Sequence, residues 1–490
     1  MAAARDAVVT SFDGTPIVTH LFGPATPPPS GRAPTVLVGP TYSSPGATQP
    51  DEDSGSGPGL ATLRAAGYNV VTWDPRGFGT SGGVSRLDSP AYEGRDVQAI
   101  LSWLALQPEA QLDAPGDPRV AMSGLSYGAT IQYVAAALDR RIDAIMPDSG
   151  WHSLISALFK DGAVKTSWLN ALCTTGAPSG LTGGLLGAPG AQLGGVDPHL
   201  TTACVDGVAG NLSVADRRWF EAIGPGALVG RIRAPTLILQ GTPDTFFPLS
   251  EAIANFAALR AHGVAAKMIW YCGGHGACAT PAGDPQYPVR EELAWLRRWL
   301  GRDRKVDTGP RFEWIDDQGT WRSGPDYPLA AAGTVAAAGR GTLSLSPFTS
   351  PKLGLTDLTT PDDHAASVRF ARPRRGADLV GTPKIRLTYR GRADPARTFV
   401  YAQIIDAAAR RVIGGETTPI PVVLDGRRHT IERPLEAIAV HTVAGSSYAL
   451  QISSGGTTYA LQHSLGSIRL TAVHATLPIV NAARSGRSVH

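Results

Sequence analysis

The sequence predicts two domains, an α/β domain built on a parallel sheet and an all-β domain behind it. The chain has 490 residues, whereas a single hydrophobic core stops growing near ~250–300 residues. Up to residue 300, short apolar runs alternate with helical patterns, as they do where helices cover a parallel sheet. Beyond residue 310, short β-rich runs recur without a helical period, which is typical of a β-sandwich.

The first hundred residues contain strand and helix signals in turn. Residues 7–22 predict two strands around Asp13-Gly14, a dipeptide that favours a tight hairpin. The other elements expected before residue 110 are two buried strands, residues 35–38 and 68–73, and two helices, residues 60–66 and 91–106.

Residues 120–129 carry the strongest functional signal. Here an apolar lead-in runs into Gly124-Leu-Ser-Tyr-Gly, which satisfies the G-x-S-x-G pattern, and a helical stripe begins at Ile131. Strand, tight turn and helix are the context of a nucleophile elbow, so Ser126 is the expected nucleophile. The glycines are needed where backbone segments approach too closely for a Cβ atom. The alternative is a chance match in a chain with 57 glycines.

The alternation of strands and helices is interrupted in the middle of the chain. A strand is expected at residues 142–146, and then Gly- and Pro-rich segments with scattered aromatic residues fill about residues 150–230. An insertion at this place predicts a cap over the active site. The pattern then resumes with strands at residues 235–241 and 266–271 and helices at residues 249–262 and 289–300.

The domain boundary is expected in the charged segment 301–310, which ends in Gly-Pro. Residues 1–305 would form the catalytic domain and residues 306–490 a β-sandwich of the jelly-roll type. The strands expected in this second domain are residues 367–370, 384–389, 398–405, 437–443, 448–452 and 467–473.

A serine nucleophile needs a base and an orienting carboxylate, which follow in the order Ser, acid, His in the α/β-hydrolase fold. Asp244 follows the strand at residues 235–241, and His275 follows the next one. The alternatives are a turn-capping aspartate and an ordinary loop histidine. The histidines that compete for the role of base do not lie in the first loop after a late strand: His152, His199 and His262.

The four cysteines allow three pairings. Local pairing, Cys173 with Cys204 and Cys272 with Cys278, is the preferred interpretation and would imply export from the cell. A metal site at Cys272, His275 and Cys278 is the sharper alternative, but it lacks an evident fourth ligand and would take the catalytic base. No metal is therefore expected. Free buried thiols in a cytoplasmic enzyme are the remaining alternative.

Together these features resemble the X-Pro dipeptidyl-peptidase/cocaine esterase family of serine hydrolases. The resemblance rests on Gly124-Leu-Ser-Tyr-Gly, on Asp74-Pro-Arg-Gly-Phe-Gly-Thr-Ser-Gly, on the Asp244 and His275 loops, on the cap and on the C-terminal β domain. It covers nearly the whole chain. It implies an acyl-serine mechanism that needs no cofactor.

The resemblance also implies an oxyanion hole with two donors. One is the backbone N–H of Tyr127, and the other is a tyrosine hydroxyl after an early strand, for which Tyr42 is the candidate. The family usually has Pro-Tyr at this place, where this chain has Pro40-Thr-Tyr. The family's elbow usually reads G-x-S-Y-x-G, and here Ala129 replaces the last glycine.

The expected substrate is a small ester or a short X-Pro peptide, and the sequence does not decide between them. A peptidase would need carboxylates to hold a free amino terminus; Asp148 is a candidate, although a structural role is the preferred interpretation. The non-enzymatic alternative is a carbohydrate- or partner-binding protein with a degenerate hydrolase half, which the complete set of Ser126, Asp244 and His275 argues against.

Composition excludes several other classes. The net charge of +3 is spread along the chain without a basic block, which argues against a nucleic-acid partner. No apolar run approaches the ~18 residues of a membrane span. The first residues have no apolar signal core. The preferred cysteine pairing leads us to expect an exported protein whose signal peptide is absent from this chain, with a cytoplasmic protein as the alternative. The oligomeric state is not predicted.

Overall fold

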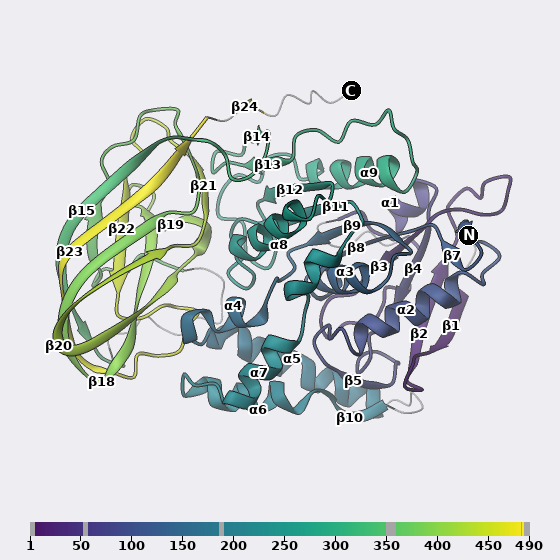
Figure 1. The fold of residues 1–490 in the computed structure, drawn as a ribbon, viewed down its shortest axis with the longest axis horizontal. Coiled ribbons are helices and arrows are strands. Elements are labelled where there is room, and N and C mark those ends of the chain that lie inside the picture. Colours follow the sequence, from purple (N-terminus) through teal and green to yellow (C-terminus); the bar gives the residue numbers. More distant parts are fainter. Residues whose placement is uncertain (1–4, 52–56, 186–190, 349–358, 482, 485–490) are drawn as a thin grey trace.

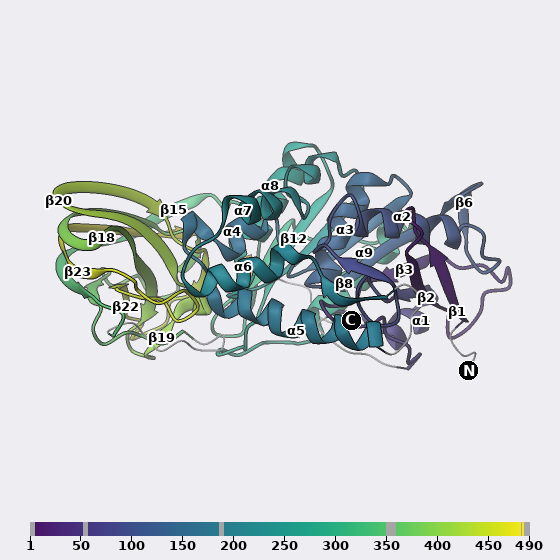
Figure 2. The same cartoon turned by 90° about the horizontal axis from the view of Figure 1, so that it is seen from below.

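The computed structural model describes residues 5–51, 57–185, 191–348, 359–481 and 483–484. It contains two bodies that lie end to end along the long axis of the molecule (Figures 1 and 2). One is a helix-covered sheet with a helical cap, and the other is a curled antiparallel β domain, at the left in both views. Among the described residues, no helix is long and apolar enough to cross a membrane.

A mixed sheet forms the centre of the first body, in the order β1-β2-β4-β3-β8-β9-β11-β12-β13-β14-β24. The strands from β4 to β13 run parallel, so their carboxyl ends meet at one edge. The strands are β1 (Arg5–Thr10), β2 (Pro16–Phe22), β3 (Thr35–Val38), β4 (Asn69–Trp73), β8 (Val120–Leu125), β9 (Ile142–Asp148), β11 (Thr236–Gly241), β12 (Ala266–Tyr271), β13 (Phe312–Ile315), β14 (Trp321–Gly324) and β24 (Ala483–Arg484).

Helices cover both faces of this sheet, which explains why its central strands read as continuous apolar runs. α1 (Leu60–Ala65) and α9 (Tyr287–Trp299) pack into the core on one face. The core on the other face includes residues of three helices: α2 (Glu93–Leu104), α3 (Tyr127–Leu138) and α8 (Leu249–Ala261). Three short strands lie in the connections: β5 (Gly83–Ser85), β6 (Leu112–Ala114) and β7 (Asp117–Pro118).

The boundary expected between residues 305 and 306 lies too early, because the first sheet continues beyond it. β13 pairs in parallel with β12, and β14 pairs with β13. The charged segment 301–310 reads as a linker, but Phe312 and Trp314 directly after it are fully buried. Glu313 between them forms an ion pair with Lys267 at 2.6 Å. The sheet of the first domain therefore continues through β14, whose outer edge pairs with β24.

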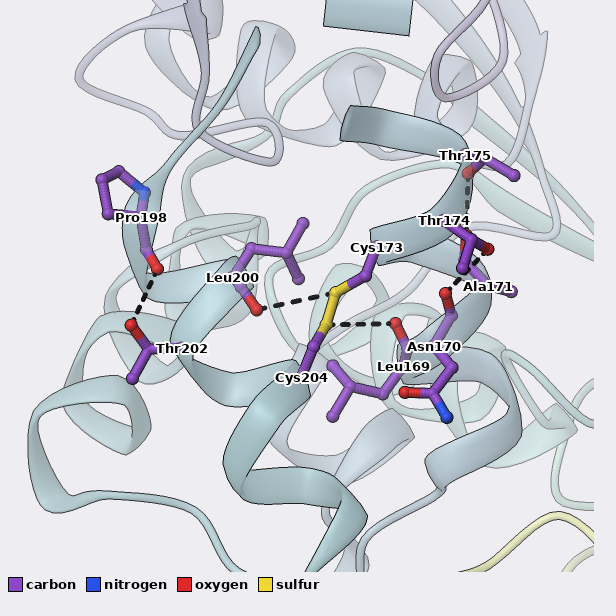
Figure 3. Close-up of a disulfide and its surroundings, with 10 residues drawn as sticks. All are labelled: Leu169, Asn170, Ala171, Cys173, Thr174, Thr175, Pro198, Leu200, Thr202 and Cys204. Atoms are coloured by element: carbon purple, nitrogen blue, oxygen red, sulfur yellow. Dashed lines mark hydrogen bonds between the residues drawn. A yellow bond between two sulfur atoms is a disulfide. The ribbon is translucent and has the colours of Figure 1, made fainter. Parts of the chain in front are cut away.

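The cap fills the region where it was expected. Its elements are α4 (Leu154–Leu158), η1 (Lys160–Gly162), α5 (Thr166–Leu185), β10 (Ala191–Val196), α6 (Pro198–Val208), α7 (Val214–Ala222) and η2 (Gly226–Arg231). A disulfide between Cys173 and Cys204 joins α5 to α6 (Figure 3). β10 pairs with β5, so the cap is also tied to the segment that follows β4. An aromatic core of its own lies between the cap helices and the sheet edge.

The second body is a curled antiparallel β-sheet that encloses a separate hydrophobic core. Its elements are β15 (Ala331–Leu345), β16 (Ala366–Arg369), β17 (Asp378–Gly381), β18 (Lys384–Asp406), β19 (Arg411–Val412), η3 (Ile413–Gly415), β20 (Thr418–Pro434), β21 (Ile438–His441), β22 (Tyr448–Ser453) and β23 (Leu465–Val480). The two strands expected at residues 384–389 and 398–405 are parts of the single strand β18. The strand runs through Gly391 and Pro395, with shifts of register against β20 in this stretch.

Candidate active site

Ser126 lies between β8 and α3 in a left-handed backbone conformation, with φ 63° and ψ −114°. This conformation is strained for a residue with a side chain, so the packing around the turn must hold it. A Cβ atom on Gly124 would lie 2.6 Å from the Gly39 carbonyl oxygen, and one on Gly128 would collide with the same carbonyl group. The Ser126 N–H donates to the Asp148 carbonyl at 2.8 Å. The glycines therefore allow the loop after β3 to press against the turn that carries Ser126.

Asp244 lies in the loop after β11, and its side chain is fully buried. Its Oδ1 atom accepts the backbone N–H groups of Phe246 at 3.1 Å and of Phe247 at 2.9 Å. The side-chain amide of Gln240 reaches Oδ2 at 3.4 Å. These donors satisfy a buried carboxylate and fix its plane, which leaves Oδ2 directed at the next loop.

His275 connects this carboxylate to the serine. Its Nδ1 atom lies 2.8 Å from Asp244 Oδ2, and its Nε2 atom lies 2.7 Å from Ser126 Oγ. The His275 backbone N–H also donates to Asp244 Oδ2, at 3.1 Å. The structure thus brings the three predicted residues together in one continuous row of hydrogen bonds, from Asp244 through His275 to Ser126. The aspartate favours the tautomer in which Nδ1 carries the proton and Nε2 is free to accept one.

The loop of His275 is closed by a disulfide between Cys272 and Cys278. Gly274 in this loop has φ +79°, and a Cβ atom there would lie 2.6 Å from Asp244 Oδ2. The loop therefore packs directly on the carboxylate, and the disulfide ties its two ends together. Both cysteine pairs are those preferred from the sequence. Because the sulfur atoms of Cys272 and Cys278 are bonded to each other, they do not present the two thiolates of the metal alternative.

Aromatic rings surround the imidazole of His275. The ring centroids of Phe246 and Phe247 lie 5.0 and 5.1 Å from it, and that of Trp168 lies 6.0 Å from it. Trp168 stacks on Phe246 at 4.5 Å and donates its indole N–H to the Thr245 hydroxyl at 3.0 Å. The sequence did not identify these three aromatic residues as neighbours of the base. The only signals in the sequence were the Phe-Phe pair that follows Asp244 and the tryptophans of the cap.

Tyr42 lies in the loop after β3, where the oxyanion donor was sought. Its ring packs edge-on against Phe78 at 5.0 Å and against Tyr127 at 5.7 Å. Its hydroxyl is buried without a hydrogen-bond partner in the described part of the chain, and burial raises the pKa of this phenol. A Cβ atom on Gly176 of α5 would collide with the hydroxyl, so the cap lies directly over it. Tyr42 is therefore a protonated donor with unused hydrogen-bonding capacity.

Tyr127, the other residue predicted for the oxyanion hole, bonds its side chain away from the row of Asp244, His275 and Ser126. Its hydroxyl lies 3.2 Å from Ser85 Oγ and 3.4 Å from Glu93 Oε1, on the side of α2. Tyr127 is the first residue of α3, and the first N–H groups of a helix have no acceptor within the helix. They also carry the positive end of the helix dipole. A developing negative charge beside Ser126 would be stabilised at this position.

The carboxylate and the carbonyl group of Asp148 already accept hydrogen bonds within the protein, as those of a structural residue would. Its carboxylate accepts the Tyr271 hydroxyl at 2.7 and 3.0 Å and the Ser149 hydroxyl at 2.9 Å, and its carbonyl holds the Ser126 N–H. The other histidines considered as bases all have partners elsewhere: His152 bonds Asn255, His199 bonds Asp216 and His262 bonds the Ala258 carbonyl.

Known proteins share both the sequence pattern and the fold. The profile of the X-Pro dipeptidyl-peptidase (S15) family matches residues 13–277. A CocE/NonD family hydrolase from Staphylococcus aureus has a TM-score of 0.66 at 14% identity, over 97% of this chain and 93% of that chain. An α-amino acid ester hydrolase has a TM-score of 0.70 at 13% identity, over 97% of this chain and 96% of that chain. At these identities the two structures establish the fold.

One curated relative matches a smaller part of the sequence. A polyketide transferase from a Penicillium species is 27% identical over 141 residues, which are 28% of this chain and 42% of that protein. The chain thus aligns with less than half the length of this relative.

The parallel sheet, the elbow after β8 and the helical insertion after β9 define an α/β-hydrolase. The chain belongs to the X-Pro dipeptidyl-peptidase (S15) family of hydrolases, whose profile covers more than half of its residues.

Proposed function

We propose that the protein is a serine hydrolase that cleaves ester or amide bonds through an acyl-serine intermediate. The observation that supports this most strongly is the row Asp244–His275–Ser126, in which both hydrogen bonds are shorter than 3 Å. The row lies at an elbow whose strained backbone is maintained by close glycine packing. Strain at such a position is typical of a functional site.

The proposed reaction begins when His275 Nε2 takes the proton of Ser126 as Oγ attacks the substrate carbonyl. Asp244 keeps the imidazole in the required tautomer and stabilises the imidazolium. The Tyr127 N–H and the Tyr42 hydroxyl would donate to the oxyanion of the tetrahedral intermediate. His275 then protonates the leaving group, and a water molecule activated by the same residue releases the acyl group.

The surroundings of His275 favour an apolar acyl group. Three aromatic rings line the imidazole, whereas two carboxylates of the hydrolase domain, those of Asp148 and Glu251, already have partners. Asp148 accepts from Tyr271, and Glu251 accepts the N–H groups of His152 and Ser153. A free amino terminus, which needs an unoccupied carboxylate, is therefore the less favoured substrate feature. Esters and amino-blocked X-Pro amides fit the site better.

A matched series of chromogenic substrates tests this proposal. Aryl esters with acetyl, butyryl and phenylacetyl groups would be compared with Xaa-Pro anilides whose amino terminus is either free or acetylated. We expect kcat/KM to rise with the apolar area of the acyl group and acetylation of the anilides to increase it. Higher kcat/KM for the free-amine anilides than for their blocked forms would contradict the proposed acyl preference.

A fluorophosphonate label separates the hydrolase from the non-catalytic alternative. We expect the label at Ser126 by peptide mass mapping, and no label in the Ser126→Ala variant. A folded wild-type chain that stays unlabelled would favour a binding protein with a degenerate hydrolase half. The two disulfides further support the proposal that the enzyme acts outside the reducing cytoplasm.

A further inference from the structure

Lys165 is a buried lysine behind the loop that carries Asp244. It directly precedes α5, and only 3% of its surface is exposed. Its Nζ atom donates to the Thr245 carbonyl at 2.6 Å and reaches the Phe246 carbonyl at 3.4 Å. A lysine is seldom buried without a specific partner. Here its partners are backbone atoms of the loop that holds the acid.

The same two peptide groups connect Lys165 to Asp244. The Thr245 carbonyl and the Phe246 N–H belong to one peptide unit, and the Phe246 carbonyl and the Phe247 N–H belong to the next. Both N–H groups donate to Asp244 Oδ1. Each peptide therefore has the ammonium group at its carbonyl end and the carboxylate at its N–H end. Hydrogen bonds arranged in such a chain polarise and strengthen one another in a water-excluded setting.

We propose that Lys165 is a positioning residue for the hydrolytic reaction. It fixes and polarises the two peptides that hold Asp244, and through Asp244 it fixes the orientation of His275. This inference rests on the proposed function, since it assigns Lys165 a part in the same reaction. The cap is thereby coupled to the loop after β11 that carries Asp244, the acid loop. Lys165 and Trp168 at the start of α5 both bond to Thr245 in this loop.

The competing explanation is charge balance. Glu416 and Glu436 of the β domain, Lys160 of the cap and Asp244 all act electrostatically on Lys165, and the Tyr459 ring lies 5.9 Å from Nζ. Glu416 is buried, and its Oε1 atom has no partner in the described part of the chain. On this explanation Lys165 is present only because Glu416 would otherwise be an uncompensated buried charge.

A double substitution separates the two explanations. Lys165→Met combined with Glu416→Gln removes both charges together and keeps similar side-chain volumes, so it avoids an unpaired glutamate. If Lys165 positions the acid loop, the double variant folds but loses roughly ten- to a hundredfold in kcat, with KM little changed. Glu416→Gln alone should keep kcat near the wild-type value. A double variant with wild-type kcat would show that Lys165 only balances charge, and would overturn the proposal.

A mutant cycle tests whether Lys165 acts through Asp244. Lys165→Met should lower kcat by a much smaller factor in an Asp244→Asn background than in the wild type. The carboxylate that Lys165 supports is already absent there. An equal loss in both backgrounds would overturn the proposal. Lys160→Met is the matched control: it removes a half-buried lysine that pairs with Glu436 and, within the described residues, has no bond to the loop of Asp244. It should lower stability and leave kcat near the wild-type value.

Labelling with fluorophosphonate keeps this inference separable from the proposed function. A wild-type chain that is not labelled at Ser126 would overturn the proposed function and the role of Lys165 with it. A labelled wild type together with a fully active Lys165→Met/Glu416→Gln variant would overturn the role of Lys165 alone.

Discussion

At the scale of single residues, Ser126 depends on its neighbours for both its position and its expected reactivity. Its backbone conformation is strained, its N–H is held by Asp148, and its hydroxyl is bonded to His275. None of these contacts requires the hydroxyl for folding. The reaction and the fold can therefore be separated by substitution.

Ser126→Ala should lower kcat by on the order of 10⁴ or more and leave the fold intact. The loss follows because no other nucleophile in the row can take the acyl group. Ester hydrolysis and circular dichroism measure the two effects on one sample. Retention of most of the activity would refute the assignment of Ser126, Asp244 and His275 together.

Tyr42→Phe should remove one oxyanion donor while keeping the ring between Phe78 and Tyr127. The expected loss is roughly 10²–10³ in kcat, about 2.7–4 kcal/mol, with KM little changed. Steady-state kinetics on an aryl ester measure it. Tyr68→Phe is a control on a buried tyrosine of the opposite core. Wild-type kinetics of Tyr42→Phe would indicate that a backbone N–H of the loop after β3 serves instead.

At the scale of elements, different interactions fix the loops at the carboxyl edge of the sheet. The His275 loop is closed by a disulfide, the acid loop is bonded from behind by Lys165, and the turn of Ser126 is held by glycine packing. The start of α2 uses a buried carboxyl group: Glu93 accepts the backbone N–H groups of Arg86 and Ser89.

Opening the Cys272–Cys278 disulfide should lower activity, because the two ends of the His275 loop are then free to separate. Cys272→Ser/Cys278→Ser should reduce kcat by about tenfold or more, in line with the sensitivity of a base to small displacements. Cys173→Ser/Cys204→Ser is the matched control, since that bond joins α5 to α6 within the cap. Thiol titration of the denatured, unreduced protein checks the starting state: four reactive thiols would show that neither bond forms.

Glu93 should make stability depend on pH. Burial raises the pKa of Glu93 from about 4.5 to about 7. Between these values the unfolded chain releases this proton while the folded chain keeps it, so stability falls as the pH rises through this range. The whole effect is on the order of 3 kcal/mol.

Urea unfolding of the wild type and of Glu93→Gln at several pH values between 4.5 and 7.5 measures this slope. Glu93→Gln should flatten it, because the glutamine carries no titrating proton. Glu221→Gln on the exposed side of α7 is a control that should leave the slope unchanged. An unchanged slope in Glu93→Gln would assign the pH dependence to other groups.

At the scale of the whole molecule, the β domain helps to form the back wall of the site. Gly414 of η3 packs close to the Thr242 carbonyl in the acid loop, and the Thr458 carbonyl accepts the Ser167 hydroxyl at the start of α5. Lys160 of the cap forms an ion pair with Glu436 of the β domain. The two bodies thus meet at the elements that hold Asp244.

Lys160→Met should destabilise this interface, because it removes the cation that is hydrogen-bonded to the buried Glu436. The loss in unfolding free energy should be about 3 kcal/mol, measured by urea denaturation at pH 7. Lys160→Met combined with Glu436→Gln should recover part of that loss. Equal stability of Lys160→Met and the wild type would show that the pair contributes nothing to the contact between the bodies.

The parts of this architecture that local patterns encode could be predicted from the sequence. The elbow, the alternating strands and helices and the loops of Asp244 and His275 all follow from residues close together in the chain. The roles of Lys165 and Trp168 could not be found in this way. Their partners lie about 80 residues further along the chain, and the cap sequence between them has no regular pattern. The domain boundary failed for a related reason. β13 joins the sheet by pairing with β12. The charged, linker-like segment 301–310 before β13 gives no sign of this pairing.

The return of the chain to its first sheet has a consequence for synthesis. β14 pairs with β24, so the segment between residues 324 and 483, which contains the whole β domain, is inserted between two strands of one sheet. While a ribosome makes this segment, the outer edge of β14 has no strand beside it. Unpaired edges recruit other chains, and nascent multidomain chains are exposed to this hazard longest. Arrested or clipped products that end inside the β domain should therefore aggregate through the edge of the hydrolase sheet.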